Sequence, residues 1–277
     1  MVLRDATTLE VFMVQRHHAT AFMGGAYVFP GGRVDAPDLD AADDRWCDEC
    51  GLAASRFPDL PAGEAVAYHV AAIRELFEEA GVLLARDASG SFVSLAHPGH
   101  HQRFARYRAD LHGGTRTLRD VVERERLRLA LDAVVPWAHW VTPARETTRR
   151  FDTRFFIARA PEQQAPAHDE TETTASVWIA PSVAILRARA GDIVLPPPTW
   201  TTLRELEPFA SVDDVLVAAS TRRMPRREPA LLERDGLQTL LLPGDPLNPD
   251  PLVGEPSYET RFVIVSEGVW RAERAVP

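Results

Sequence analysis

Residues 71–84 have the sequence AAIRELFEEAGVLL. Its apolar residues recur with the spacing of a helix and share one face, namely Ala72, Ile73, Leu76, Phe77 and Ala80. The pattern extends upstream and predicts a helix over residues 64–80. Gly81 then occupies the position at which a glycine commonly ends a helix. We therefore expect an amphipathic helix that packs against a core and stops at this glycine.

Three carboxylates crowd the last turn of this helix. Glu75, Glu78 and Glu79 stand at positions i, i+3 and i+4, which places their side chains within about 5–6 Å of one another. Each like-charged pair costs about 0.2–0.5 kcal/mol, and each carboxylate opposes the helix dipole by about 0.3–1 kcal/mol. Arg74 neutralises only part of this charge. Such a conflict with stability is typical of residues kept for function.

A bound divalent cation is the simplest partner for these carboxylates. Oxygen ligands of this kind suit Mg²⁺ or Mn²⁺, whereas the alternative is a solvated acidic helix end. The turn Phe29-Pro30-Gly31-Gly32 lies upstream, and glycines at such a turn let a phosphate approach the backbone closely. The combination favours a site for metal and phosphate.

The glycine turn and the acidic helix resemble the Nudix hydrolase superfamily, whose box reads G-x5-E-x7-R-E-U-x-E-E-x-G-U, with U aliphatic. The second half is complete from Arg74 to Val82. The first half departs from the pattern, because the position after Gly32-x5 holds Asp38 instead of Glu. About 28 additional residues then precede Arg74.

A box split in this way is similar to one branch, the peroxisomal and mitochondrial type of coenzyme A diphosphatase and its bacterial relatives. Four further segments look like that branch, at residues 22–38, 137–158, 195–216 and 241–251. The resemblance covers nearly the whole chain. It implies an α+β fold, with a Nudix-like mixed β-sheet sandwiched between helices, a helical insertion and additional C-terminal elements.

We expect residues 1–277 to form a single domain with insertions. One insertion, at about 39–63, lies inside the box and reads as an irregular loop because it is acidic and lacks periodicity. A second, at about 87–135, has helical patterns joined at a Gly-Gly pair, and a C-terminal extension begins at about residue 200. Strands are predicted over 8–16, 26–29, 137–141, 151–158 and 177–179, and helices over about 181–190, 199–207 and 211–219.

The resemblance also implies roles for individual residues. Glu78 and Glu79 would bind metal, and Glu75 would be either a third ligand or the catalytic base. Arg74 would orient Glu78 through an i,i+4 ion pair, although a plain surface salt bridge is the alternative. Glu172 lies six residues before Trp178 and would complete the metal shell or accept a proton from water; the alternative is a polar loop.

Substrate phosphate has several predicted contacts. Gly31 and Gly32 offer backbone, and Arg16 and Arg33 offer charge at the end of a strand and after the turn. A second basic group, with a surface role as its alternative, comprises Arg145, Arg149, Arg150 and Arg154. The run RRMPRR at 222–227 reads as solvated.

Composition limits the partners. The formal net charge of -9 disfavours a nucleic-acid polymer, and no apolar run approaches the roughly 18 residues of a membrane span. The absence of a signal-peptide pattern leads us to expect a cytoplasmic protein.

Cys47 and Cys50 have zinc-knuckle spacing, but a structural zinc site needs a second pair of ligands. Trp137 and Trp140 are expected in the core.

These observations predict a metal-dependent hydrolase of a diphosphate bond in a nucleoside diphosphate linked to another group. Coenzyme A or acyl-coenzyme A is the first candidate substrate, and ADP-ribose, NADH and nucleotide sugars are the alternatives. A non-catalytic nucleotide sensor on the same scaffold is the competing class. The altered first half of the box favours the sensor, whereas the intact carboxylates disfavour it. The protein could form a homodimer in either case.

Overall fold

The computed structural model describes residues 1–17, 23–143, 150–169, 173–234, 236–249, 258–266 and 269–274. A mixed sheet lies at the centre, with the order β10-β7-β8-β1-β2-β3 and with β9 paired to β2. Its strands are β1 Val2–Asp5, β2 Leu9–Arg16, β3 Tyr27–Val28, β7 Val135–Val141, β8 Asp152–Arg159, β9 Thr173–Ile179 and β10 Arg226–Arg227. The β1–β8 and β10–β7 pairs are parallel and the other pairs are antiparallel, as the predicted mixed sheet requires.

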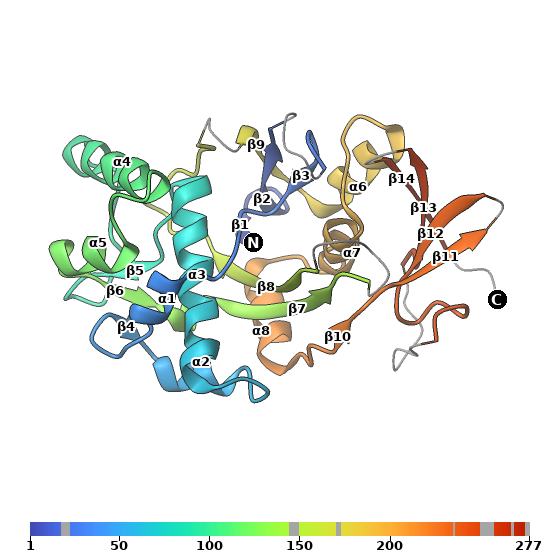
Figure 1. The fold of residues 1–277 in the computed structure, drawn as a ribbon. Coiled ribbons are helices and arrows are strands. Elements are labelled where there is room, and N and C mark those ends of the chain that lie inside the picture. The colour runs from blue at the N-terminus through green and yellow to red at the C-terminus, as the bar shows by residue number, and fades with distance from the viewer. Residues whose placement is uncertain are drawn as a thin grey trace.

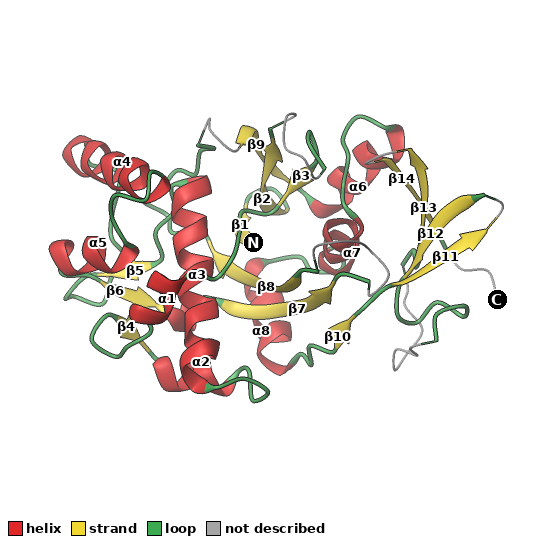
Figure 2. Ribbon diagram, viewed as in Figure 1, coloured by secondary structure: helices red, strands yellow, loops and turns green. Residues whose placement is uncertain are grey.

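The central sheet has a core on each face, because alternate residues of a strand point to opposite sides. Phe12 and Val14 of β2 belong to the cluster that includes the apolar face of α3 Ala62–Ala80, whereas Val11 and Met13 belong to the cluster on the other face. The second cluster is built with α6 Pro181–Ala190, α7 Pro197–Leu206 and α8 Val212–Thr221. The predicted sandwich of a sheet between helices is therefore confirmed (Figures 1 and 2).

Helix α3 runs from Ala62 to Ala80 and contains the acidic turn. Its buried residues follow the predicted periodicity, and Gly81 ends it in the left-handed conformation with φ of 69°. A residue with a Cβ would be strained there. The predicted helix and its stop signal are both confirmed.

The insertion inside the box is more regular than predicted. It contains helix α1 Ala36–Asp40, strand β4 Cys47–Asp48 and helix α2 Cys50–Ser55. The expectation of an irregular loop is wrong, because helices of five and six residues are too short to show a helical repeat in sequence. Packing of α1 and α2 against α3 stabilises them instead.

The second insertion is helical only in part. Helices α4 Pro98–His112 and α5 Leu118–Glu125 flank Gly113-Gly114, as predicted. After Arg126, which is left-handed, the chain forms strand β6 Arg128–Ala130 and a 3₁₀ turn at Leu131–Ala133. The expectation of helix up to residue 135 is wrong, since β6 completes a small sheet with β4 and β5 Ala85–Arg86.

The C-terminal region forms a separate four-stranded antiparallel sheet. It consists of β11 Ala230–Arg234, β12 Leu237–Leu241, β13 Arg261–Ser266 and β14 Val269–Glu273. This sheet lies at the opposite end of the molecule from α4 and α5 (Figure 1). No helix in the described part of the chain combines the length and the apolar character that a membrane span needs.

Candidate active site

The glycine turn after β3 lies directly against the acidic turn of α3. The backbone N–H of Gly31 donates a hydrogen bond to Oε2 of Glu79 over 3.0 Å. A Cβ at Gly32 would overlap the carboxylate of Glu75. The φ of Gly31 is 154°, a region that residues with a Cβ rarely adopt. Gly31 is therefore needed for its backbone conformation, and Gly32 for the close approach of the Glu75 carboxylate.

Arg74 is the centre of the carboxylate cluster. Its Nε and Nη2 donate to the two carboxylate oxygens of Asp38 over 2.8 and 3.0 Å. Its Nη1 lies 2.9 Å from Oε1 of Glu75 and 3.3 Å from Oε1 of Glu78. The i,i+4 contact expected between Arg74 and Glu78 is thus present, but the arginine is a buried hub with 9% of its side chain exposed. A plain surface salt bridge does not describe it.

Asp38 fills the position at which the Nudix box has its first glutamate. Helix α1 holds it in the interior, with 1% of the side chain exposed, and a bidentate pair of this kind is among the stronger ionic contacts. The glutamate of the box pattern is thus replaced here by an aspartate, which has a shorter side chain. The spacing from Gly32 identifies the place of Asp38 in the box, but no sequence pattern predicts its pairing with Arg74.

Burial determines the electrostatics of the cluster. Desolvation raises the pKa of Glu75 to about 7, with Arg74 opposing the rise and Glu78 adding to it. Burial also raises the pKa of Glu78, again opposed by Arg74. These carboxylates are therefore costly to ionise together without further positive charge.

The donor chemistry of the cluster fits a hard divalent cation, because Glu75, Glu78 and Glu79 offer only oxygen ligands. In the described ranges, however, no three His, Cys, Asp or Glu side chains converge on one point as metal ligands. Arg74 lies between two of the three glutamates. A cation there would compete with Arg74 for carboxylate oxygens.

The other predicted contacts for phosphate differ in their placement. Arg16 is at the end of β2, paired with Thr173 at the start of β9. Arg33 has an exposed side chain, and its backbone carbonyl accepts a hydrogen bond from Nη2 of Arg74 over 2.7 Å. Glu172 lies outside the described residues.

The second basic group is described only at Arg150 and Arg154, both of which pair with carboxylates away from the acidic turn. Arg145 and Arg149 lie outside the described residues, and Arg150 pairs with Glu228 over 2.7 Å. Arg154 is buried, stacks on Tyr68 at 4.5 Å and pairs with an aspartate of β8. The described members of the group have partners of their own.

The arginine run at 222–227 was predicted to be solvated, and this prediction is confirmed for Arg223 and Arg226, which are exposed, but wrong for the other two arginines. Arg222 and Arg227 donate to Glu205 of α7 over 2.6 and 2.7 Å. Their guanidinium groups stack on Trp137 and Trp140, which are buried as predicted. A buried counter-charge and two aromatic faces account for the difference, and neither is visible in a run of arginines.

One residue that contacts the acidic turn was not predicted from the sequence. Arg108 of α4 donates from Nε to the backbone carbonyl of Glu78 over 2.7 Å. It lies 30 residues from its acceptor, within a helix whose many arginines read as a solvated face. No local signal distinguishes it from its neighbours.

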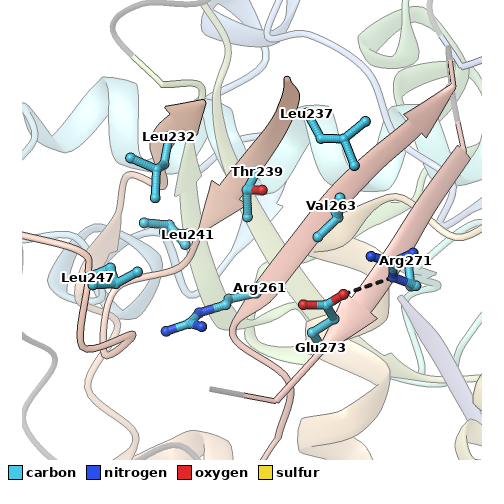
Figure 3. A pocket seen from close by; sticks show the side chains of 9 residues that line it. All are labelled: Leu232, Leu237, Thr239, Leu241, Leu247, Arg261, Val263, Arg271 and Glu273. Atoms are coloured by element: carbon cyan, nitrogen blue, oxygen red, sulfur yellow. Dashed lines mark hydrogen bonds and ion pairs between the residues drawn. The ribbon is translucent and has the colours of Figure 1, made fainter. Parts of the chain in front are cut away.

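A cavity of about 280 Å³ lies on the C-terminal sheet, away from α3 (Figure 3). Its charged lining residues are Arg261, Arg271 and Glu273, and the last two pair with each other over 2.8 Å. The rest of the lining is mostly apolar. This cavity offers no carboxylate cluster and is distinct from the site on α3.

Comparison with known proteins gives consistent matches. The model of the NUDT19 Nudix domain matches residues 51–206. Acyl-coenzyme A diphosphatase NUDT19 of Homo sapiens is 33% identical over 281 residues, which cover 87% of this chain and 73% of that protein. The protein of the same name from Gallus gallus is 31% identical, over 90% of this chain and 74% of its own. The crystal structure of a Nudix hydrolase from Alicyclobacillus acidocaldarius has a TM-score of 0.65 and 26% identity, and the match covers 81% of this chain and 94% of that one.

Proposed function

The chain belongs to the NUDT19 family of Nudix hydrolases, and on that premise we propose that it hydrolyses the diphosphate bond of coenzyme A or of an acyl-coenzyme A. The observation that carries the proposal is the contact between the glycine turn and the acidic turn of α3. There Gly31 donates to Glu79 and Gly32 lies against Glu75. The relatives named for the acyl-coenzyme A reaction support the choice of substrate.

Mg²⁺ or Mn²⁺ is the cofactor that we assign to this site. Glu78 and Glu79 would hold it, and Glu75 would be a third ligand or the base. When bound, such an ion neutralises diphosphate charge and lowers the pKa of water. Glu172 is a further candidate for the metal shell or the base.

The chain's own residues prepare the site for a charged substrate. Arg74 holds Glu75 and Glu78 on one side of α3, while Asp38 holds Arg74. The space beside the Cα of Gly31 is open, whereas the space beside the Cα of Gly32 is filled by the carboxylate of Glu75, so Gly31 is the better candidate for the close approach of a phosphate. Arg16 and Arg33 are the candidates for pairing with phosphate oxygens.

The hydrolysis of ADP-ribose, NADH or nucleotide sugars is the alternative within the same class, and a nucleotide sensor is the alternative outside it. The altered first half of the box favours a sensor, but the buried Asp38–Arg74 pair weakens this support because Asp38 supplies a carboxylate at the altered position. Cys47 and Cys50 are free thiols, which suits a reducing compartment. We therefore also propose a cytoplasmic enzyme.

Turnover tests the proposal directly. Purified protein is incubated with Mg²⁺ or Mn²⁺ and with coenzyme A, an acyl-coenzyme A, NADH or ADP-ribose, and the products are separated by chromatography. We expect adenosine 3′,5′-bisphosphate and a phosphopantetheine from the first two substrates. Glu78→Gln should lower kcat by about 10²–10³-fold, because it removes charge at the reacting centre. Glu64→Gln, at the exposed opposite end of α3, is the matched control.

Hydrolysis of none of the four compounds would contradict the proposed activity and favour the sensor. Faster hydrolysis of ADP-ribose or NADH than of either coenzyme A compound would keep the reaction class and overturn the substrate. An equal effect of Glu78→Gln and Glu64→Gln would overturn the role given to the acidic turn.

A further inference from the structure

The C-terminal end of α3 has an unusual set of capping donors. The last four carbonyls of a helix have no partner within the helix. In α3 these carbonyls belong to the same end of the helix as the acidic side chains. Gly81 N–H donates to the carbonyl of Phe77 over 2.9 Å, and Ala167 N–H donates to that of Ala80 over 3.0 Å. The carbonyl of Glu78 accepts from Arg108. Two of these three donors therefore come from other parts of the chain.

Arg108 joins two segments through one guanidinium group. Its Nε donates to the carbonyl of Glu78 over 2.7 Å, and its Nη2 donates to the carbonyl of Ala167 over 2.9 Å. A Cβ at Gly81 would lie 3.2 Å from Nη1 of Arg108. The glycine that ends α3 thus also leaves space for the arginine.

The charge of Arg108 is placed where α3 is most negative. Burial lowers its pKa, and the carboxylates of Asp169 and Glu79 act in the opposite direction. A guanidinium remains charged under all ordinary conditions. A positive charge at a helix C-terminus also interacts favourably with the dipole.

Ala167, whose carbonyl accepts a hydrogen bond from Arg108, lies close in sequence to the start of β9. After Ala167 the chain reaches Asp169, whose carboxylate accepts from the N–H and the hydroxyl of Thr173 over 2.9 and 2.8 Å. Thr173 begins β9 and pairs with Arg16 at the end of β2. The segment thus connects the end of α3 to the strand ends at which a phosphate contact was predicted.

The helix that carries Arg108 is anchored one turn earlier. Phe104 of α4 packs edge-on against Phe77 of α3, with ring centroids 6.3 Å apart. Phe104 and Arg108 are four residues apart and so share a face of α4. The second insertion therefore presents both an apolar and a charged contact to the last turn of α3.

We propose that Arg108 is a positioning residue, which fixes the last turn of α3 and residues 167–169 relative to each other so that Glu78 and Glu79 are held for the cation. This inference rests on the proposed function. Arg108 contacts two backbone carbonyls and is not assigned to the substrate. Its removal should therefore change kcat and metal affinity much more than KM for substrate.

The test compares Arg108→Met with Arg106→Met, which makes the same change at an exposed position of the same helix. We expect Arg108→Met to weaken Mn²⁺ binding, measured by electron paramagnetic resonance without substrate, and to lower kcat, each by about 10–100-fold. KM for coenzyme A should stay within about twofold. Arg108→Lys retains the charge but has one nitrogen for two carbonyls, so we expect an intermediate loss of both quantities.

Equal Mn²⁺ binding and kcat in Arg108→Met and Arg106→Met would overturn the proposal. A rise in KM alone would also overturn it, because Arg108 would then act on substrate. If Arg108→Met does not fold, Arg108→Lys decides the matter, and wild-type values in that variant would overturn the role of the paired contact. Should wild-type protein hydrolyse nothing, the proposed function fails, while the Mn²⁺ comparison still tests the positioning role.

Discussion

Two buried ionic clusters in this protein differ in their ratio of arginine side chains to carboxylates. On α3, the single guanidinium of Arg74 lies within 3.3 Å of oxygens from Asp38, Glu75 and Glu78. On α7, the single carboxylate of Glu205 accepts from two arginines, and also from Nε1 of Trp137 and the hydroxyl of Tyr258 over 3.1 and 3.2 Å. The first cluster has a surplus of negative charge and the second a surplus of positive charge.

The two clusters also differ in the exposure of their carboxylates and in the elements that they contact. Glu205 is 7% exposed, and its contacts in the described part of the chain join α7 to Trp137 of β7, to Arg227 of β10, and to Arg222 and Tyr258. Glu75 and Glu78 are 13% and 15% exposed and lie on the helix turn that faces the glycines. We infer that the cluster around Glu205 joins structural elements, whereas the cluster around Arg74 has negative charge available for a cation.

Glu205→Gln should have the largest effect on stability. It leaves the buried Arg227 and the partly exposed Arg222 without their charge partner, and breaking a buried ion pair costs about 3–5 kcal/mol. We expect urea unfolding to show a loss of this size, with kcat per folded molecule within about twofold of wild type. Glu228→Gln, which breaks pairs with more exposed arginines, should cost at most about 1 kcal/mol. A large loss of kcat in folded Glu205→Gln would erase the distinction between the clusters.

Asp38→Asn should affect both stability and activity. The substitution removes the charged acceptor of two hydrogen bonds from Arg74, and hydrogen bonds to charged groups contribute about 1.5–3 kcal/mol. Arg74 would then pair more closely with Glu75 and Glu78, so we expect kcat to fall by about tenfold or more. Urea unfolding and kcat on coenzyme A measure the two effects. Full activity in this variant would show that Asp38 has only a structural role.

The pH dependence of stability should distinguish Glu75 in metal-free protein. Its pKa is raised from 4.5 to about 7 by burial, so the folded state binds more protons than the unfolded state between these values. The associated stability is present below about pH 4.5 and is lost as pH rises through about 7, with an upper limit of about 3 kcal/mol. Urea unfolding at pH 5 and pH 8 should show this loss in wild type and a smaller loss in Glu75→Gln. The same pH dependence in both proteins would contradict the burial of Glu75.

The parts of the fold that sequence predicted are those with a repeating pattern. The apolar period of α3 and the stop at Gly81 gave the helix that carries the site. The short helices α1 and α2 escaped prediction because their stability comes from packing on α3.

Of the candidate site, only the contacts within one helical turn could be predicted from the sequence. Glu75, Glu78 and Glu79 share one turn, so their proximity follows from helix geometry. The contacts of Arg74 with Asp38 and of Arg108 with Glu78 span 36 and 30 residues, and chain packing alone brings them together. Glu205 escaped notice for the same reason, since the arginines that surround it come from another segment.

Direct measurement of Mn²⁺ binding tests the central claim that the acidic turn of α3 holds a divalent cation. Electron paramagnetic resonance would follow free Mn²⁺ in titrations of wild type, Glu78→Gln, Glu79→Gln and the control Glu64→Gln. We expect wild type and Glu64→Gln to bind alike, and both variants of the acidic turn to bind at least about tenfold more weakly. Equal binding by all four proteins, or no binding by wild type, would contradict the claim.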